Sequence, residues 1–88
     1  MPRILLVDDD AAELQLASTH VRLAGYDVEE CTDGLQALGR ALAEPPDMIV
    51  CDLQLPGLDG FGVLSALRAQ PKTAGIPVIF LTSHTQNS

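Results

Sequence analysis

Short apolar runs alternate along the chain with stretches in which apolar residues recur every three or four positions. The runs are typical of buried strands, and the recurring stretches are typical of helices packed on one face. This alternation predicts an α/β fold, a doubly wound parallel sheet covered by helices on both faces. The expected strands are Arg3–Val7, Tyr26–Cys31, Asp47–Cys51 and Ile76–Thr82.

Capping signals set the bounds of the three helices. The first begins after Asp10 as N-cap, with Glu13 at the spacing of a capping box, and stops at Gly25. The second opens at Thr32-Asp33-Gly34 and ends at Pro45-Pro46, and the third runs from about Gly60 to Gln70. The residues expected to face the core are Leu14, Ala17, Val21, Ala24, Leu35, Leu38, Leu42, Phe61, Leu64 and Leu67.

Acidic residues interrupt the second strand, which suits an edge of the sheet better than its centre. With right-handed crossovers this favours the strand order 2-1-3-4, in which the first and third strands are neighbours. The carboxyl ends of all strands then share one rim, where ligands bind in open α/β sheets.

Composition narrows the function classes. The 88 residues make one domain with an aliphatic core, since 47% are apolar and only 3% aromatic. The net charge of −7 argues against direct nucleic-acid binding. Cys31 and Cys51 lack metal or redox spacing and are expected to be free buried thiols. Without a signal peptide or a long apolar run, a cytoplasmic protein that does not enter a membrane is expected.

Carboxylates gather at the expected rim. Asp8, Asp9 and Asp10 follow the first strand, Asp52 ends the third, and Thr82 ends the fourth. Converging like charges need a cation, and hard oxygen ligands suit Mg²⁺. A metal beside a carboxylate and a hydroxyl is typical of phosphoryl transfer. Asp52 stands alone and is the better nucleophile, Asp8 and Asp9 are the better metal ligands, and Asp10 is more simply a helix cap.

Three motifs together resemble the receiver domain of two-component response regulators. They are ILLVDDD after the N-terminus, IVCDLQLPGLDG around Asp52, and PVIFLTS at the end of the fourth strand. Their order and spacing agree over about Pro2 to Ser83. The resemblance implies a flavodoxin-like receiver fold over residues 1–88, and a module without enzymatic turnover beyond its own phosphorylation and dephosphorylation.

The resemblance also implies roles for the acidic residues. Asp52 would accept a phosphoryl group from a sensor histidine kinase or a phosphotransfer protein. Asp9 and Asp52 would bind Mg²⁺ or Mn²⁺, with Asp8 acting directly or through water. The backbone carbonyl of Gln54 would complete the protein ligands.

Further roles fall near the C-terminus. Thr82 would hydrogen-bond the phosphoryl group, while Gln54 and His84, each two residues beyond a site residue, would tune dephosphorylation. The family also has a fifth strand and helix and a lysine ending that strand, and this chain ends before them. Its one lysine, Lys72, lies at the opposite rim. We therefore expect an incomplete receiver domain whose apolar fourth strand supports self-association, directly or through a swapped segment.

Two other functions fit parts of the pattern. Without the family lysine, the chain could be a receiver-like scaffold that is not phosphorylated. A haloacid-dehalogenase-like phosphatase would use Asp8-x-Asp10 after the first strand, but it leaves Asp52 without a role. A phosphorylated receiver domain requires Asp52, whereas the phosphatase requires Asp8.

Overall fold

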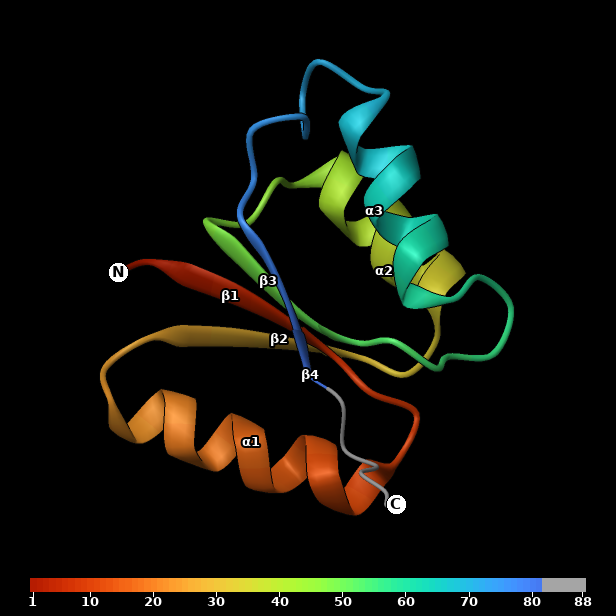
Figure 1. The fold of residues 1–88 in the computed structure, drawn as a ribbon. Helices are drawn as coiled ribbons and strands as arrows, with labels where there is room; N and C mark the ends of the chain where they lie inside the picture. The colour runs from red at the N-terminus through yellow and green to blue at the C-terminus, as the bar shows by residue number, and fades with distance from the viewer. Residues whose placement is uncertain (82–88) are drawn as a thin grey trace.

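The computed structural model describes residues 1–81, which form a parallel sheet with helices on both faces (Figure 1). The strand order is β2-β1-β3-β4, so the predicted fold class and the predicted edge position of the acidic second strand are confirmed. In chain order the elements are β1 (Arg3–Val7), α1 (Ala11–Leu23), β2 (Asp27–Cys31), α2 (Gly34–Ala43), β3 (Met48–Asp52), α3 (Gly60–Arg68) and β4 (Val78–Leu81). Within the described range the observed bounds agree with the predicted ones to within two residues, and those of β1 are the predicted ones.

The main core lies between the sheet and the α2–α3 layer. The register aligns Val7 of β1 with Cys31 on one side and Cys51 on the other. All three side chains are buried, with Leu5 and Ile49, beneath α2 and α3. Burial raises the pKa of the Cys31 thiol to about 11 and that of Cys51 to about 12, so both stay protonated at neutral pH. Both cysteines are free, as predicted.

Two residues predicted to face the core, one in α2 and one in α3, are exposed in the structure. Ala37 and Ala41 are in the core, whereas Leu35 is 62% exposed. In α3, Phe61 is 63% exposed and its ring is tilted against that of Phe80 at a centroid distance of 5.5 Å. The predictions for Leu35 and Phe61 were wrong because periodicity gives an apolar stripe but not the centre of the contact.

On the opposite face, α1 covers β1 and β2. Leu14 packs on Ile4 and Leu6, and Ser18 is buried beside them. Ala24, predicted to face this core, is exposed because it is the C-cap of α1, and Gly25 follows with a positive φ of 98°. The helix therefore ends where it was predicted to end, but its last residue packed against the core is Val21, one turn before Ala24.

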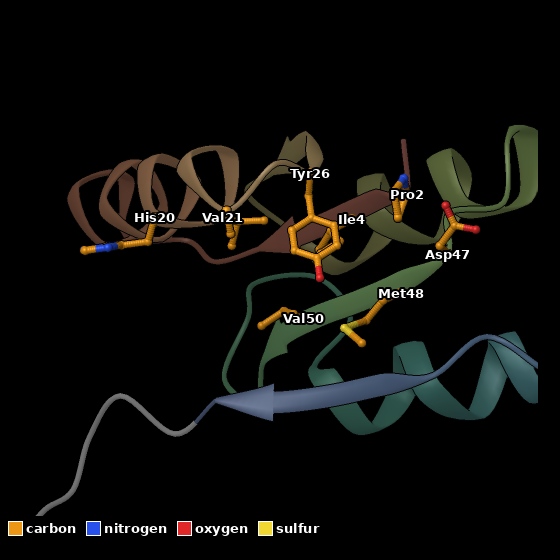
Figure 2. A pocket seen from close by; sticks show the side chains of 9 residues that line it. Pro2, Ile4, His20, Val21, Tyr26, Asp47, Met48 and Val50 are labelled. Atoms are coloured by element: carbon orange, nitrogen blue, oxygen red, sulfur yellow. The ribbon is translucent and has the colours of Figure 1, made fainter.

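A largely apolar groove of about 430 Å³ remains beside α1, over β1 and β3 (Figure 2). Tyr26, Met48 and Val50 are among its lining side chains. Ile79, aligned with Val50, and Leu81 extend this apolar face onto β4, where each is about half exposed. Self-association through this edge stays a prediction. No helix within residues 1–81 is long and apolar enough to span a membrane.

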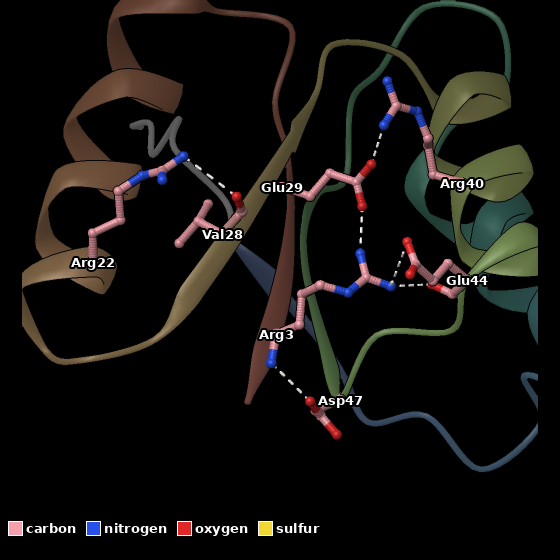
Figure 3. A network of polar contacts seen from close by, with 7 residues as sticks. All are labelled: Arg3, Arg22, Val28, Glu29, Arg40, Glu44 and Asp47. Atoms are coloured by element: carbon pink, nitrogen blue, oxygen red, sulfur yellow. Dashed lines mark hydrogen bonds and ion pairs between the residues drawn. The ribbon is translucent and has the colours of Figure 1, made fainter. Parts of the chain in front are cut away.

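A network of charged residues ties the edge strand to α2 (Figure 3). The carboxylate of Glu29 on β2 pairs with both Arg3 of β1 and Arg40 of α2. Arg3 also donates to the carbonyl oxygen of Glu44, and its backbone N–H donates to Asp47 Oδ2 at 2.7 Å. An acid on the edge strand is thus explained by two cations that share it.

We predict that Glu29→Gln lowers the free energy of unfolding by about 1–2 kcal/mol, because the partly buried guanidinium group of Arg3 and the more exposed one of Arg40 lose the negative charge that they share. Glu30→Gln is the matched control, since the ion pair of Glu30 with Arg22 is long, at 3.9 Å, and more exposed than that of Glu29 with Arg3. Its effect should stay within about 0.5 kcal/mol. Urea denaturation followed by far-UV circular dichroism measures both, and equal effects would contradict the prediction.

Candidate functional site

The pairing of β1 with β3 brings two carboxylates to one rim of the sheet. Val7 is aligned with Cys51, so Asp8 and Asp52 are the next residues along the two neighbouring strands. Carboxylate oxygens of Asp8, Asp52 and Glu13 all lie within 4.8 Å of one another. Asp52 is only 5% exposed, Asp8 is partly buried, and Glu13 is exposed. The predicted meeting of Asp8 and Asp52 is thus present in the structure.

The start of α1 explains how Glu13 comes to join them. Asp10 is the N-cap, as predicted, and its Oδ1 accepts the N–H groups of Ala12 at 2.9 Å and Glu13 at 3.1 Å. The N–H of Asp10 donates to Asp8 Oδ1 at 2.9 Å, the position that Glu13 would take in a capping box. Sequence reasoning gave Glu13 only this capping role, although its place in the first turn beside Asp8 was available as a signal.

The loop after β3 is fixed at both of its ends. The N–H of Gln54 donates to Asp52 Oδ1 at 3.2 Å, and the N–H of Gly60 donates to the carbonyl of Leu53 at 2.9 Å. Asp59 caps α3 by accepting the N–H of Gly62 at 2.8 Å. These bonds hold the backbone beside Asp52, while a metal-binding role for the Gln54 carbonyl stays a prediction.

The first residue of α2 packs directly against the middle of this loop. A Cβ at Gly34 would lie 1.7 Å from the carbonyl oxygen of Leu58, a separation that no side chain can occupy. The N–H of Gly34 also donates to the carbonyl of Pro56 at 3.4 Å. Gly57 supplies the positive φ of 79° that the turn requires. The loop that follows Asp52 is therefore positioned by α2 as well as by β3.

The three carboxylates repel one another because they lie close together, and their partial loss of solvent disfavours the charged forms further. Burial raises the pKa of Asp8, opposed by the Asp10 N–H, and the charge of Asp52 raises it further. Loss of solvent and then the charges of Asp8 and Asp10 raise the pKa of Glu13. The ion pairs recorded within residues 1–81 involve other acids. Three hard oxygen donors without a cationic partner suit Mg²⁺, which binds carboxylates and waters.

The remaining predicted site residues divide into two groups. Asp9 is exposed and lies outside the cluster of Asp8, Glu13 and Asp52, so its metal role stays a prediction. Thr82 and His84 lie outside the described residues. The ammonium group of Lys72 donates to the carbonyl of Leu42 at 2.8 Å, near the end of α2 and at the rim opposite the carboxylates.

Comparisons with known proteins agree with this geometry. The family described as response regulator receiver domain matches residues 4–88. The DNA-binding dual master transcriptional regulator RpaA of Synechocystis is 47% identical over 83 residues, which are 94% of this chain and 34% of that protein. The chain thus spans about a third of that relative's length.

Two solved structures share the fold. Chemotaxis response regulator CheY4 of Vibrio cholerae has a TM-score of 0.91 at 35% identity, over 98% of this chain and 72% of that one. The receiver domain of sensor histidine kinase PA1611 from Pseudomonas aeruginosa has a TM-score of 0.90 at 35% identity, over 94% and 68%. That structure has a magnesium ion coordinated in its active-site cleft.

We predict that Gly34→Ala destabilises the protein by about 1–3 kcal/mol, because the new methyl group must displace the Leu58 backbone. Gly39→Ala in the same helix meets nothing within 4 Å and should stabilise by about 0.5–1 kcal/mol. Chemical denaturation of the two variants gives the comparison. A stabilising Gly34→Ala would show that the loop yields freely.

We also predict that Asp8→Asn stabilises the protein at pH 7 in the presence of EDTA. The folded-state pKa of Asp8 is raised, so its favourable contribution exists only while it is protonated and is lost as pH rises through that pKa. The gain from asparagine should therefore shrink as pH falls toward about 4, the ordinary aspartate pKa. Thermal melts at both pH values test this, with exposed Asp27→Asn as control. A pH-independent difference between the two variants would contradict it.

Proposed function

This chain belongs to the response regulator receiver domain family of two-component signalling, and from that premise we propose that Asp52 is its phosphoacceptor. The observation that supports this is the buried carboxylate of Asp52 at the end of a central strand, with Asp8 beside it. The donor would be a phosphohistidine of a sensor histidine kinase or phosphotransfer protein. A cytoplasmic location belongs to the same proposal.

The proposed transfer is a nucleophilic displacement at phosphorus. A carboxylate oxygen of Asp52 forms the new O–P bond, the P–N bond of the donor histidine breaks, and the released imidazole nitrogen takes a proton from solvent. Asp52 is held for this attack because one of its oxygens accepts the Gln54 N–H. Hydrolysis of the acyl phosphate by water returns the carboxylate.

Asp8 and Asp52 would hold Mg²⁺ or Mn²⁺, with Asp9 and the carbonyl of Gln54 as further ligands. When bound, the ion neutralises charge on the phosphoryl oxygens and on the carboxylates. Thr82 would donate to a phosphoryl oxygen, and Gln54 and His84 would set the rate at which water reaches the acyl phosphate. Phosphorylation would then change which partner the domain binds.

One observation favours a second candidate. The only lysine in the sequence, Lys72, lies at the opposite rim with its ammonium group on the Leu42 carbonyl. Lys72 cannot stabilise the phosphoryl group from that rim, and loss of one such charge-stabilising donor typically costs a factor of about 10²–10³ in rate. A receiver-like scaffold that is not phosphorylated is therefore the alternative, and family membership argues against the phosphatase.

Incubation with acetyl phosphate and Mg²⁺ should add one phosphoryl group to the chain, measured by intact mass spectrometry. The adduct should be absent from Asp52→Asn, retained in the exposed control Asp27→Asn, and removed by hydroxylamine, as an acyl phosphate must be. Omission of Mg²⁺ should abolish it. A folded chain that gains no mass would contradict phosphoacceptance and favour the scaffold.

A further inference from the structure

Glu13 adds a third carboxylate to the site from an element that the strand-end motifs do not include. Its oxygen lies within 4.8 Å of those of both Asp8 and Asp52, although it comes from the first turn of α1 rather than from a strand end. The remaining acids of the first strand end, Asp9 and Asp10, lie outside this cluster. Glu13 therefore shares the site more closely than its sequence neighbours do.

Helix capping does not account for the position of Glu13. A glutamate three residues after an N-cap ordinarily accepts the N-cap backbone N–H, but here Asp8 Oδ1 accepts it at 2.9 Å. The Glu13 carboxylate forms none of the ion pairs recorded within residues 1–81. An exposed glutamate could turn to solvent, yet the Glu13 side chain lies beside two like charges and hydrogen-bonds that of Asp8.

A second observation points to a ligand at this place. Asp52 is only 5% exposed to solvent. Within residues 1–81 its carboxylate accepts one recorded hydrogen bond, from the N–H of Gln54 to Oδ1. Within that range no donor is recorded for its other oxygen, Oδ2, which is therefore available there to a bound cation. In the PA1611 receiver domain, which shares the fold, a magnesium ion is coordinated in the active-site cleft.

We propose that Glu13 is a cation-binding residue of this site, supplying a third carboxylate to the divalent ion held by Asp8 and Asp52. This inference rests on the proposed function, because it assigns a residue toward the ion that the phosphoacceptor would use. The affinity of an oxygen site for a hard cation rises with the number of charged ligands. Glu13 therefore makes this site bind its ion more tightly than the strand-end aspartates alone would.

The test is a Mn²⁺ titration of the chain, followed by the electron paramagnetic resonance signal of the free ion. Glu13→Gln should weaken binding by about tenfold or more, because loss of a group that only supports metal ligands already costs about that much. Glu44→Gln is the matched control, since its side chain is 82% exposed at the far end of α2, and it should change affinity less than twofold. An ionic strength of about 0.15 M screens distant charges beyond roughly 8 Å.

Melting temperatures measured with and without Mn²⁺ provide a second test, because a purely structural role of Glu13 would not produce the pattern expected here. In EDTA, Glu13→Gln should melt higher than the parent because one repelling charge is gone. The rise in melting temperature on adding Mn²⁺ should be smaller for Glu13→Gln than for the parent. These two changes have opposite signs, and Glu44→Gln should show neither of them.

The outcomes separate this inference from the proposed function. Glu13→Gln that binds Mn²⁺ within twofold of the parent, while Asp52→Asn loses binding, overturns the role of Glu13 and leaves the metal site intact. Asp52→Asn that binds like the parent, or a parent that does not bind Mn²⁺, overturns the metal site and Glu13 together. Phosphorylation by acetyl phosphate remains a separate reading of Asp52 itself.

Discussion

The parallel pairing of β1 with β3 is the constraint on which the site depends. The backbone ladder aligns Val7 with Cys51, so the residues that follow must leave the sheet side by side. Because those residues are Asp8 and Asp52, the fold itself creates an electrostatic cost. The aliphatic core around Leu5 and Ile49 offsets that cost, and a local electrostatic cost of this kind is typical of functional sites.

Helices on opposite faces of the sheet complete the same rim. On one face the first turn of α1 depends on Asp8, which satisfies the backbone of its N-cap and so links helix geometry to the acidic cluster. On the other face α2 begins at Gly34, against the loop that leaves Asp52. The N-terminal ends of α1 and α2 therefore flank this rim from opposite faces of the sheet.

The sequence predicted the features that depend on the pattern of apolar and polar residues along the backbone. The predictions failed where two side chains compete for the same hydrogen bond or the same packing position. Alternating runs predicted the parallel sheet, the acids of the second strand predicted its order, and the strand ends predicted that Asp8 and Asp52 would meet. Glu13 was missed because its spacing to Asp10 indicated a cap, and only the structure shows that Asp8 takes that bond. Leu35 and Phe61 were misplaced because small residues at 37 and 41, and Val63, occupy the contact centres. The predicted role of Gln54 rests on resemblance alone, whereas that of Asp9 rests on its place after the first strand and on resemblance.

The two buried cysteines can report on how the sheet opens, because each thiol becomes reactive only when its strand is exposed. Alkylating reagents react with thiolates that they can reach, and Cys31 and Cys51 are both protonated and sealed in the folded chain. Cys31 lies on the edge strand β2, whereas Cys51 lies on β3 between two neighbours. If Cys31 is alkylated before Cys51, the sheet opens first at its β2 edge. If both thiols are alkylated at the same rate, the sheet unfolds as one cooperative unit.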